Sequence, residues 1–312
     1  MTSDLAFVVG GVARSGTTAL SQALNFHPNI FCAHEAGYAI APSGIPSDII
    51  DDLRRRCGHL PANTNQGKSV KAMEEKLAAR TLKLIGDKVP DYAIHSKLIT
   101  ERHPRTTQIC ILRDAIGSAR SFDVRAENES DTGWHRGCIG LFAILDLLII
   151  VDGLATSPSD IIVVSYSRLF TGNSDIYANL IETAFQLDVD PEVRGQFSRI
   201  ILNRKLPSST AREPSRYVNL LESLQADDLT GEIHRFGLLR STERTEIFSE
   251  YIHAVVPLVE NSGRDLLMSL PDSTRRAATE FAVGWVPRRT RALRSRGESS
   301  HALANVIERC FL

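Results

Sequence analysis

The chain has 312 residues, of which 43 % are hydrophobic and 23 % are charged, and its formal net charge is −1. This length and composition predict a folded globular protein with a sizeable core, and they exclude a chain that is disordered as a whole. A net charge so close to zero gives no overall field that would attract nucleic acid or an anionic membrane surface.

The cysteines are odd in number and widely spaced, with no Cys-x-x-Cys pair. This pattern argues against a disulfide framework and against a zinc site, and it favours a reducing compartment. The longest apolar run, residues 139–151, is interrupted by Gly140 and Asp146, so we expect no membrane span. The N-terminus has no basic segment followed by a cleavable apolar one. We therefore expect a cytoplasmic protein.

Short β-rich runs alternate with helical patterns along the first half of the chain. The predicted strands are residues 5–10, 30–33, 82–86, 107–112 and 160–164, and the helical patterns between them cover 17–26, 68–81, 91–101 and 134–154. Such alternation predicts an α/β fold with a mostly parallel sheet flanked by helices. Residues 123–132 are polar and predict a loop.

Beyond residue 173 the pattern is helical throughout, and it predicts no strand. We interpret residues 1–172 as an α/β core and residues 173–312 as a helical C-terminal extension of the same single domain. Seven arginines lie between residues 275 and 296. They predict a solvated basic helix, and the alternative is a contact with an acidic partner or substrate.

The first motif is the segment FVVGGVARSGTT, residues 7–18, in which a strand ends, a glycine-bearing loop turns and a helix begins. Backbone N–H groups and the helix N-terminus of such a loop form a phosphate cradle. Against the nucleotide-binding pattern GxxxxGK[ST], residues 11–18 lack only the lysine, which is replaced by Thr17. In ATP and GTP enzymes this lysine reaches the β- and γ-phosphates, so its loss argues against a P-loop kinase.

A ligand with one phosphate on its 5′ side and a terminal sulfate does not need that reach. Arg14, inside the loop, can contact the 5′-phosphate and the bridging oxygen instead. The alternative is a glycine turn that binds no ligand.

A second strand–turn–helix junction lies in ICILRDAIGSARS, residues 109–121. Arg113 stands at the strand end, and Ser121 follows after about two helical turns, so both can converge on one anion such as a 3′-phosphate. The alternative is that Arg113 simply pairs with Asp114.

These two motifs, together with VSYSRL at residues 164–169, resemble the sulfotransferases that use 3′-phosphoadenosine 5′-phosphosulfate (PAPS). The tyrosylprotein sulfotransferase branch is the most similar one, over roughly residues 5–170. The resemblance implies a P-loop-type sheet that binds PAPS and releases its product PAP.

The resemblance also assigns the cofactor contacts. The 5′-phosphosulfate would be held by the first loop, the 3′-phosphate by the second junction, and the nucleotide by a nearby tyrosine, for which a buried core position is the alternative. A further contact would come from the segment KLPSST, residues 205–210. The predicted cofactor-binding residues are Arg14, Ser15, Gly16, Thr17, Thr18, Arg113, Ser121, Tyr166 and Ser209.

Catalysis needs a base for the acceptor and cations for the leaving group. Glu35 stands where the tyrosylprotein branch has its base, and the neighbouring His34 is the rival base. Lys88, in GDKVP, is similar to the family's Lys-x-Pro lysine and would join Arg14 beside the leaving oxygen. As alternatives, Glu35 is a surface or capping carboxylate and Lys88 only extends from the strand edge. We expect no metal requirement.

The predicted function is sulfuryl transfer from PAPS to a hydroxyl or amine of a small-molecule, sugar or peptide acceptor, and a homodimer is possible. Two alternatives stay open: a P-loop small-molecule kinase, and a non-catalytic module that binds PAP or another nucleotide. A Ser-His-Asp hydrolase is disfavoured, because the loop lacks the GxSxG pattern of a nucleophile elbow.

Overall fold

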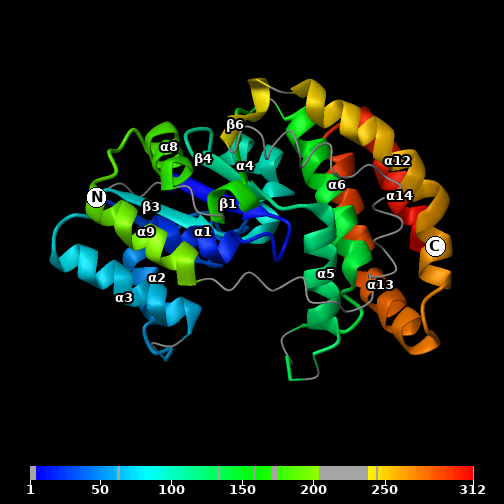
Figure 1. Cartoon of the computed structure of the whole chain (residues 1–312), viewed down its shortest axis with the longest axis horizontal. Coiled ribbons are helices and arrows are strands. Elements are labelled where there is room, and N and C mark those ends of the chain that lie inside the picture. The colour runs from blue at the N-terminus through cyan, green and yellow to red at the C-terminus, as the bar shows by residue number, and fades with distance from the viewer. Residues whose placement is uncertain are drawn as a thin grey trace.

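The computed structural model describes residues 5–311 except 62–63, 129, 132–133, 158, 171–173, 204–237 and 244. A sheet in the order β2-β3-β1-β4-β5-β6 forms the centre of the molecule (Figure 1). Its first five strands run parallel, and β6 pairs antiparallel with β5 at the edge. The strands are β1 Phe7–Gly11, β2 Ile30–His34, β3 Leu84–Lys88, β4 Thr107–Leu112, β5 Ile162–Ser165 and β6 Leu238–Arg240.

Helices cover both faces of this sheet, which confirms the predicted α/β fold with a mostly parallel sheet. The α-helices are α1 Thr17–Leu24, α2 Ile49–Cys57, α3 Asn65–Ala78, α4 Ser96–Arg102, α5 Ala115–Ala126, α6 Gly140–Thr156, α7 Tyr166–Phe170, α8 Ser174–Phe185, α9 Pro191–Asn203, α12 Thr245–Met268, α13 Asp272–Arg294 and α14 His301–Phe311. Short 3₁₀ helices are η1 Pro90–Ala93, η2 Ser241–Glu243 and η3 Glu298–Ser300.

The strand β4 shows why the sheet is covered on both sides. Ile109 and Ile111 pack against the cluster formed with α1, α8 and α9, whereas Cys110 and Leu112 pack against the cluster formed with α5, α6 and α12 to α14. Successive side chains of a strand point to opposite faces, so a strand between two helix layers is apolar throughout. This is the run TQICIL that predicts a buried strand.

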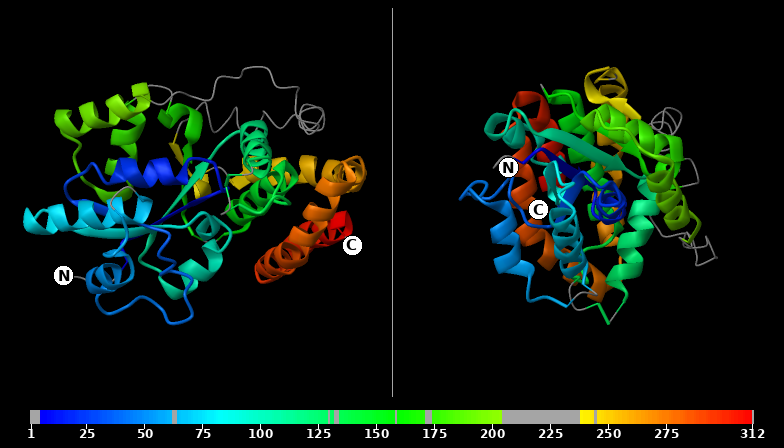
Figure 2. Two further views of the ribbon diagram at one scale, coloured as in Figure 1. Left: turned by 90° about the horizontal axis from the view of Figure 1, so that it is seen from below. Right: turned by 90° about the vertical axis from the view of Figure 1, so that its left-hand side faces the viewer.

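The C-terminal helices pack on α6 at one end of the molecule. Figure 2 shows α12, α13 and α14, in yellow to red, on the opposite side from α2 and α3. One apolar cluster contains α6 together with Trp285 and Leu293 of α13 and Ile307 of α14. Every residue of α6 from Gly140 to Leu154 is buried. The predicted helical extension is therefore fastened to the core by apolar packing.

The predicted basic helix is present as α13, and its Arg276, Arg288, Arg291 and Arg294 are exposed, but the side chains of two arginines of the tail are buried. Arg289 is 8 % exposed and forms ion pairs with Asp146 of α6 and Asp91 of η1. Arg296 forms an ion pair with the buried Asp152 of α6. A buried charge needs a partner of opposite charge. Here the partners are aspartates of the same chain and not those of another molecule.

Three other predictions need correction. The expectation of no strand after residue 173 is wrong, because β6 pairs there with β5; three residues are too few to show a period of two. The helix predicted from Trp134 starts only at Gly140, whose N–H donates to the Asp123 carboxylate at 2.7 Å. The predicted loop at 123–132 is shorter, because α5 continues to Ala126. None of the described helices combines the length and apolar character that crossing a bilayer requires.

Candidate active site

The glycine loop between β1 and α1 has the backbone of a phosphate cradle. Arg14 and Gly16 both adopt positive φ, 68° and 95°. A Cβ atom at Gly16 would come within 2.5 Å of the Tyr166 ring. Gly16 is thus required both by the left-handed turn and by the close approach of Tyr166. The loop ends at Thr17, the first residue of α1, whose N-terminus carries the positive end of the helix dipole.

Ser15 holds this loop against the sheet. Its hydroxyl donates to the carbonyl oxygen of Ile111 at 3.1 Å, and its backbone N–H donates to the carbonyl oxygen of Val12 at 3.0 Å. The side chain is fully buried. Both donors are therefore engaged within the chain, and the cofactor contact of Ser15 stays a prediction.

The two predicted anion loops meet in space. The Nε atom of Arg14 donates to the hydroxyl of Ser121 at 3.3 Å, although 107 positions separate them in the chain. An Nη1 atom of Arg113 donates to the carbonyl oxygen of Arg14 at 3.4 Å, and the Arg113 guanidinium lies over the Tyr166 ring at 4.9 Å. Four predicted cofactor residues are thereby brought together at the carboxyl ends of β1, β4 and β5.

Arg113 retains an unused donor in this group. Its Nε atom is buried and has no hydrogen-bond partner in the described part of the chain. It forms an ion pair with Oδ2 of Asp114 at 3.7 Å, which is the alternative that the sequence left open, and Asp114 also caps α5 by accepting from the N–H of Gly117. A buried guanidinium donor without a hydrogen bond is costly, and an anion would satisfy it. The residues present therefore fit a phosphate group.

Arg125 adds a third arginine, which the sequence reasoning missed. It follows Ser121 by one turn of α5, stacks on Trp134 at 4.6 Å and pairs with Asp131. Burial is the main cause that lowers the pKa of Arg14, followed by the positive charges of Arg125 and Arg113. Three guanidinium groups thus gather here, of which Arg125 pairs with Asp131 and Arg113 with Asp114. The spacing of four residues after Ser121 was the sequence signal that could have identified Arg125.

A second cluster lies where β2 and β3 end, beside the start of α1. The Nζ atom of Lys88 donates to Oε1 of Glu35 at 2.6 Å and to the hydroxyl of Thr18 at 3.2 Å. Lys88 is fully buried, whereas the Glu35 side chain is 48 % exposed. The arrangement combines a cation aimed at the phosphate loop with a carboxylate that solvent or an acceptor can reach.

His34 lies next to this ion pair. Its Nε2 atom is 3.8 Å from Oε1 of Glu35. Burial, and next the charge of Lys88, lower the pKa of His34 to about 4, although Glu35 opposes this shift. The imidazole is therefore uncharged at neutral pH.

Comparison with known proteins decides the family. The model of the family described as "Sulfotransferase family" matches residues 6–182, more than half of the chain. The chain belongs to the sulfotransferase family. Among solved structures, the sulfotransferase STF9 from Mycobacterium avium is similar, with 12 % sequence identity and a TM-score of 0.41 over 66 % of this chain and 69 % of that one. No curated protein sequence matches the chain.

In this sulfotransferase the predicted residues fall into two groups. Arg14, Gly16, Arg113, Ser121 and Tyr166 surround the junction of the two anion loops. Around Lys88 gather Glu35 and His34, the two candidate bases, and Thr18, a predicted cofactor contact. Arg14, the other residue predicted for catalysis, belongs to the first group. Ser209 lies outside the described residues. The assignment to the tyrosylprotein branch stays a prediction.

Proposed function

We propose that this sulfotransferase moves a sulfuryl group from PAPS to a hydroxyl or amine of a small-molecule, sugar or peptide acceptor. The observation that carries the proposal is the meeting of two anion loops at the Arg14–Ser121 contact, beside the unused Nε donor of Arg113. One loop alone fits any phosphate, whereas two joined loops fit a ligand with phosphate groups at two positions.

The proposed contacts follow from this arrangement. Arg14, Thr18 and the N-terminus of α1 would hold the 5′-phosphosulfate, and Arg113 and Ser121 would hold the 3′-phosphate. Arg125 adds a third guanidinium group and would strengthen the second contact. When bound, PAPS supplies the sulfuryl group and leaves as PAP.

Lys88 and Arg14 supply the positive charge that the leaving oxygen requires. Lys88 reaches the phosphate loop through its hydrogen bond to Thr18, and its burial strengthens its electrostatic effect. Because these side chains provide the charge, the proposed transfer needs no metal ion.

Glu35 is the proposed base. Its carboxylate is half exposed, so that an acceptor can reach it, and Lys88 fixes its position. A phenol has a pKa of about 10, so the carboxylate would take the proton in concert with attack on sulfur. His34 is the weaker candidate, because it is only 10 % exposed and lies behind Glu35 at 3.8 Å.

The proposal treats the chain as a single domain, since α6 and the C-terminal helices share one core. It also includes a reducing compartment such as the cytoplasm, consistent with the free thiols of all five cysteines. No nucleic-acid partner is proposed.

Calorimetry with PAP, ADP and ATP tests the ligand class. We expect PAP to bind with micromolar affinity or better, and ADP and ATP to bind at least about tenfold more weakly, because they lack the 3′-phosphate that Arg113 and Ser121 would contact. Equal affinity for the three nucleotides would overturn the proposal and favour a kinase-like site.

Two variants separate binding from transfer. Arg113→Ala should weaken PAP binding about ten- to a hundredfold, since a hydrogen bond to a charged group contributes about 1.5–3 kcal/mol. Glu35→Gln should leave PAP binding intact and lower turnover of labelled PAPS, with pools of phenols, sugars, alcohols and peptides as acceptors, by about a hundredfold or more. Unchanged turnover in the Glu35 variant would indicate a binding module instead of this base.

A further inference from the structure

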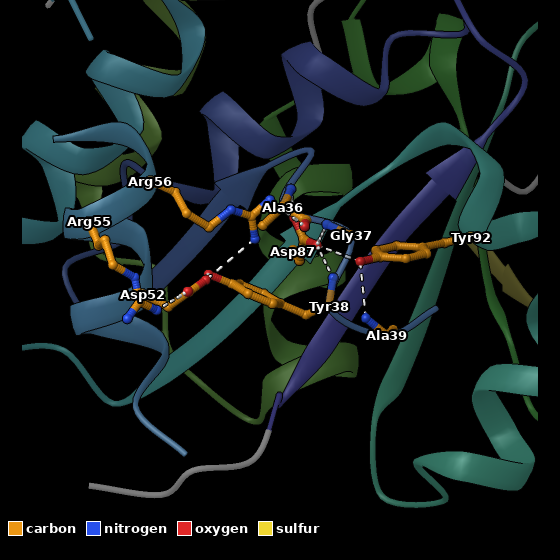
Figure 3. Close-up of polar contacts among 9 residues, drawn as sticks. All are labelled: Ala36, Gly37, Tyr38, Ala39, Asp52, Arg55, Arg56, Asp87 and Tyr92. Atoms are coloured by element: carbon orange, nitrogen blue, oxygen red, sulfur yellow. Dashed lines mark hydrogen bonds and ion pairs between the residues drawn. The ribbon is translucent and has the colours of Figure 1, made fainter. Parts of the chain in front are cut away.

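A buried carboxylate lies beneath the segment that follows Glu35. Asp87 of β3 is fully buried, and its Oδ1 atom accepts the N–H of Ala36 at 3.1 Å. Its Oδ2 atom accepts the N–H groups of Gly37 at 2.8 Å and Tyr38 at 3.2 Å (Figure 3). Three consecutive amides thus converge on one carboxylate, as they do on a bound anion in a backbone nest.

Tyr92 of η1 completes this arrangement. Its hydroxyl donates to Oδ2 of Asp87 and accepts the N–H of Ala39 at 3.2 Å. The Tyr92 side chain is 1 % exposed, and Figure 3 shows its hydroxyl between Asp87 and Ala39. Four amides in succession are therefore held by two buried side chains of the core.

Glu35 itself has a backbone that needs such support. Its φ of 57° is left-handed, a conformation that costs a residue other than glycine about 1–3 kcal/mol. Its N–H donates to the carbonyl oxygen of Lys88 at 2.7 Å, and this bond fixes the backbone on the N-terminal side of Glu35. Asp87 fixes the C-terminal side through the next three amides.

Neighbouring residues of β3 thus act on the same glutamate from two directions. The side chains of Asp87 and Lys88 point to opposite faces of the strand. Lys88 contacts the Glu35 carboxylate, and Asp87 holds the backbone that follows it.

Two further contacts lie on the outer side of the segment, and one of them is exposed. Arg56 of α2 donates to the carbonyl oxygen of Ala36 at 3.1 Å, and the Tyr38 hydroxyl donates to Asp52 at 2.9 Å. The Arg56 side chain is 46 % exposed, and exposed charged contacts contribute little. The Tyr38 hydroxyl holds one side chain only, whereas Asp87 accepts three backbone amides, so we take Asp87 as the main anchor of the backbone.

We propose that Asp87 is a positioning residue of this sulfotransferase: it fixes the backbone of Ala36 to Tyr38 and thereby keeps the Glu35 carboxylate against Lys88. This inference rests on the proposed role of Glu35 as the base. Tyr92 supports Asp87 in the same role.

Asp87→Asn tests the inference with little change of shape. The amide replaces an acceptor oxygen by an NH₂ donor that faces other donors. We expect kcat for PAPS turnover with a phenol acceptor to fall about tenfold or more, because a small misplacement of a catalytic group costs this much. KM for PAPS and the Kd of PAP should change less than about threefold. Hydrogen exchange of the amides of residues 36–38 should accelerate at least about tenfold.

Asp152→Asn is the matched control. Asp152 is a buried carboxylate that accepts from Arg296 and Ser300 in the C-terminal layer and makes no hydrogen bond to residues 35–39 in the described part of the chain. This variant should lower the melting temperature and leave kcat and the exchange of residues 36–38 unchanged. If Asp87→Asn does not fold, Tyr92→Phe gives the same test at smaller amplitude.

The outcomes are distinct. The inference would be overturned if Asp87→Asn kept the kcat of the wild type. It would also be overturned if the variant lost kcat and PAP affinity to the same extent. Unchanged hydrogen exchange of the amides of residues 36–38 in Asp87→Asn would show that the Asp87 carboxylate does not hold this backbone. The proposed function fails separately, if the wild-type protein releases no PAP from PAPS.

Discussion

At the scale of single residues, His34 and Glu35 show how neighbours at one strand end acquire different properties. Glu35 reaches solvent while it contacts Lys88, whereas His34 is enclosed beside the same cation. Burial and Lys88 disfavour the imidazolium form of His34 and lower its pKa to about 4. The environment of each side chain, and not its position in the chain, thus separates the two candidate bases.

The depressed pKa of His34 predicts a pH dependence of stability. In the unfolded chain a histidine has a pKa of about 6.5, so between this value and about 4 the unfolded state binds more protons. The free energy of unfolding should therefore fall as the pH decreases from about 6.5 to about 4. His34→Asn removes this contribution, and urea unfolding at pH 7 and pH 5 should show a smaller loss of stability for the variant than for the wild type.

The exposed His59 provides the control for this measurement. His59→Asn should lose as much stability between pH 7 and pH 5 as the wild type does, since the side chain lies at the surface. Equal losses in the His34 and His59 variants would contradict the prediction.

At the scale of elements, the sequence predicts what local patterns encode. The run TQICIL is apolar at nearly every position and identifies β4, and the glycine loop identifies the β1–α1 junction. The strand β3 was predicted at residues 82–86 but covers Leu84–Lys88, so Lys88 ends the strand instead of following it. Boundaries depend on tertiary pairing, here with β1 and β2, which no local pattern records.

Hydrogen bonds from a side chain to distant backbone groups are even harder to predict from the sequence than strand boundaries. Lys88 and Glu35 were predicted from a family resemblance, but nothing in the sequence around Asp87 indicates that it accepts three amides about fifty positions away. Backbone N–H groups are the same at every residue except proline, so a side chain that binds them has no complementary residue type to reveal it. The direction of the Ser15 hydroxyl was hidden for the same reason.

The attachment of α13 gives the prediction at this scale. Arg289 contacts Asp91 with two hydrogen bonds, of 3.0 and 3.1 Å, and Asp146 with two more, of 2.9 and 3.5 Å. Arg289→Met would leave Asp146 buried without a cation, which costs about 3–5 kcal/mol. The melting temperature should fall by about 10 °C in calorimetry.

A second substitution tests the cause of that loss. In Arg289→Met combined with Asp146→Asn the uncompensated charge is gone, and more than half of the loss should be recovered. Arg288→Met, in the exposed neighbour, should have little effect. A double variant as unstable as Arg289→Met would show that packing of the arginine stem dominates.

At the scale of the whole molecule, the sheet and the C-terminal helices share α6, and we expect them to fold as one cooperative unit. Large side chains of α13 and α14 that are buried in this core are Trp285, Leu293, Leu303, Val306 and Ile307. Each stabilises the fold by about 2 kcal/mol when buried. Their joint contribution is comparable with the whole stability of a typical domain, about 5–15 kcal/mol.

Removal of α13 and α14 should therefore abolish cooperative folding of the entire chain. A truncated protein of residues 1–271 retains all strands and both anion loops, yet one side of α6 would lose its apolar cover. We expect no sharp thermal transition and no detectable PAP binding, because the loop residues keep their geometry only on a packed sheet. Calorimetry of the two proteins side by side provides the measurement. A truncated protein that melts cooperatively and binds PAP like the full chain would mean that the C-terminal helices form a separable unit, and the single-domain proposal would be wrong.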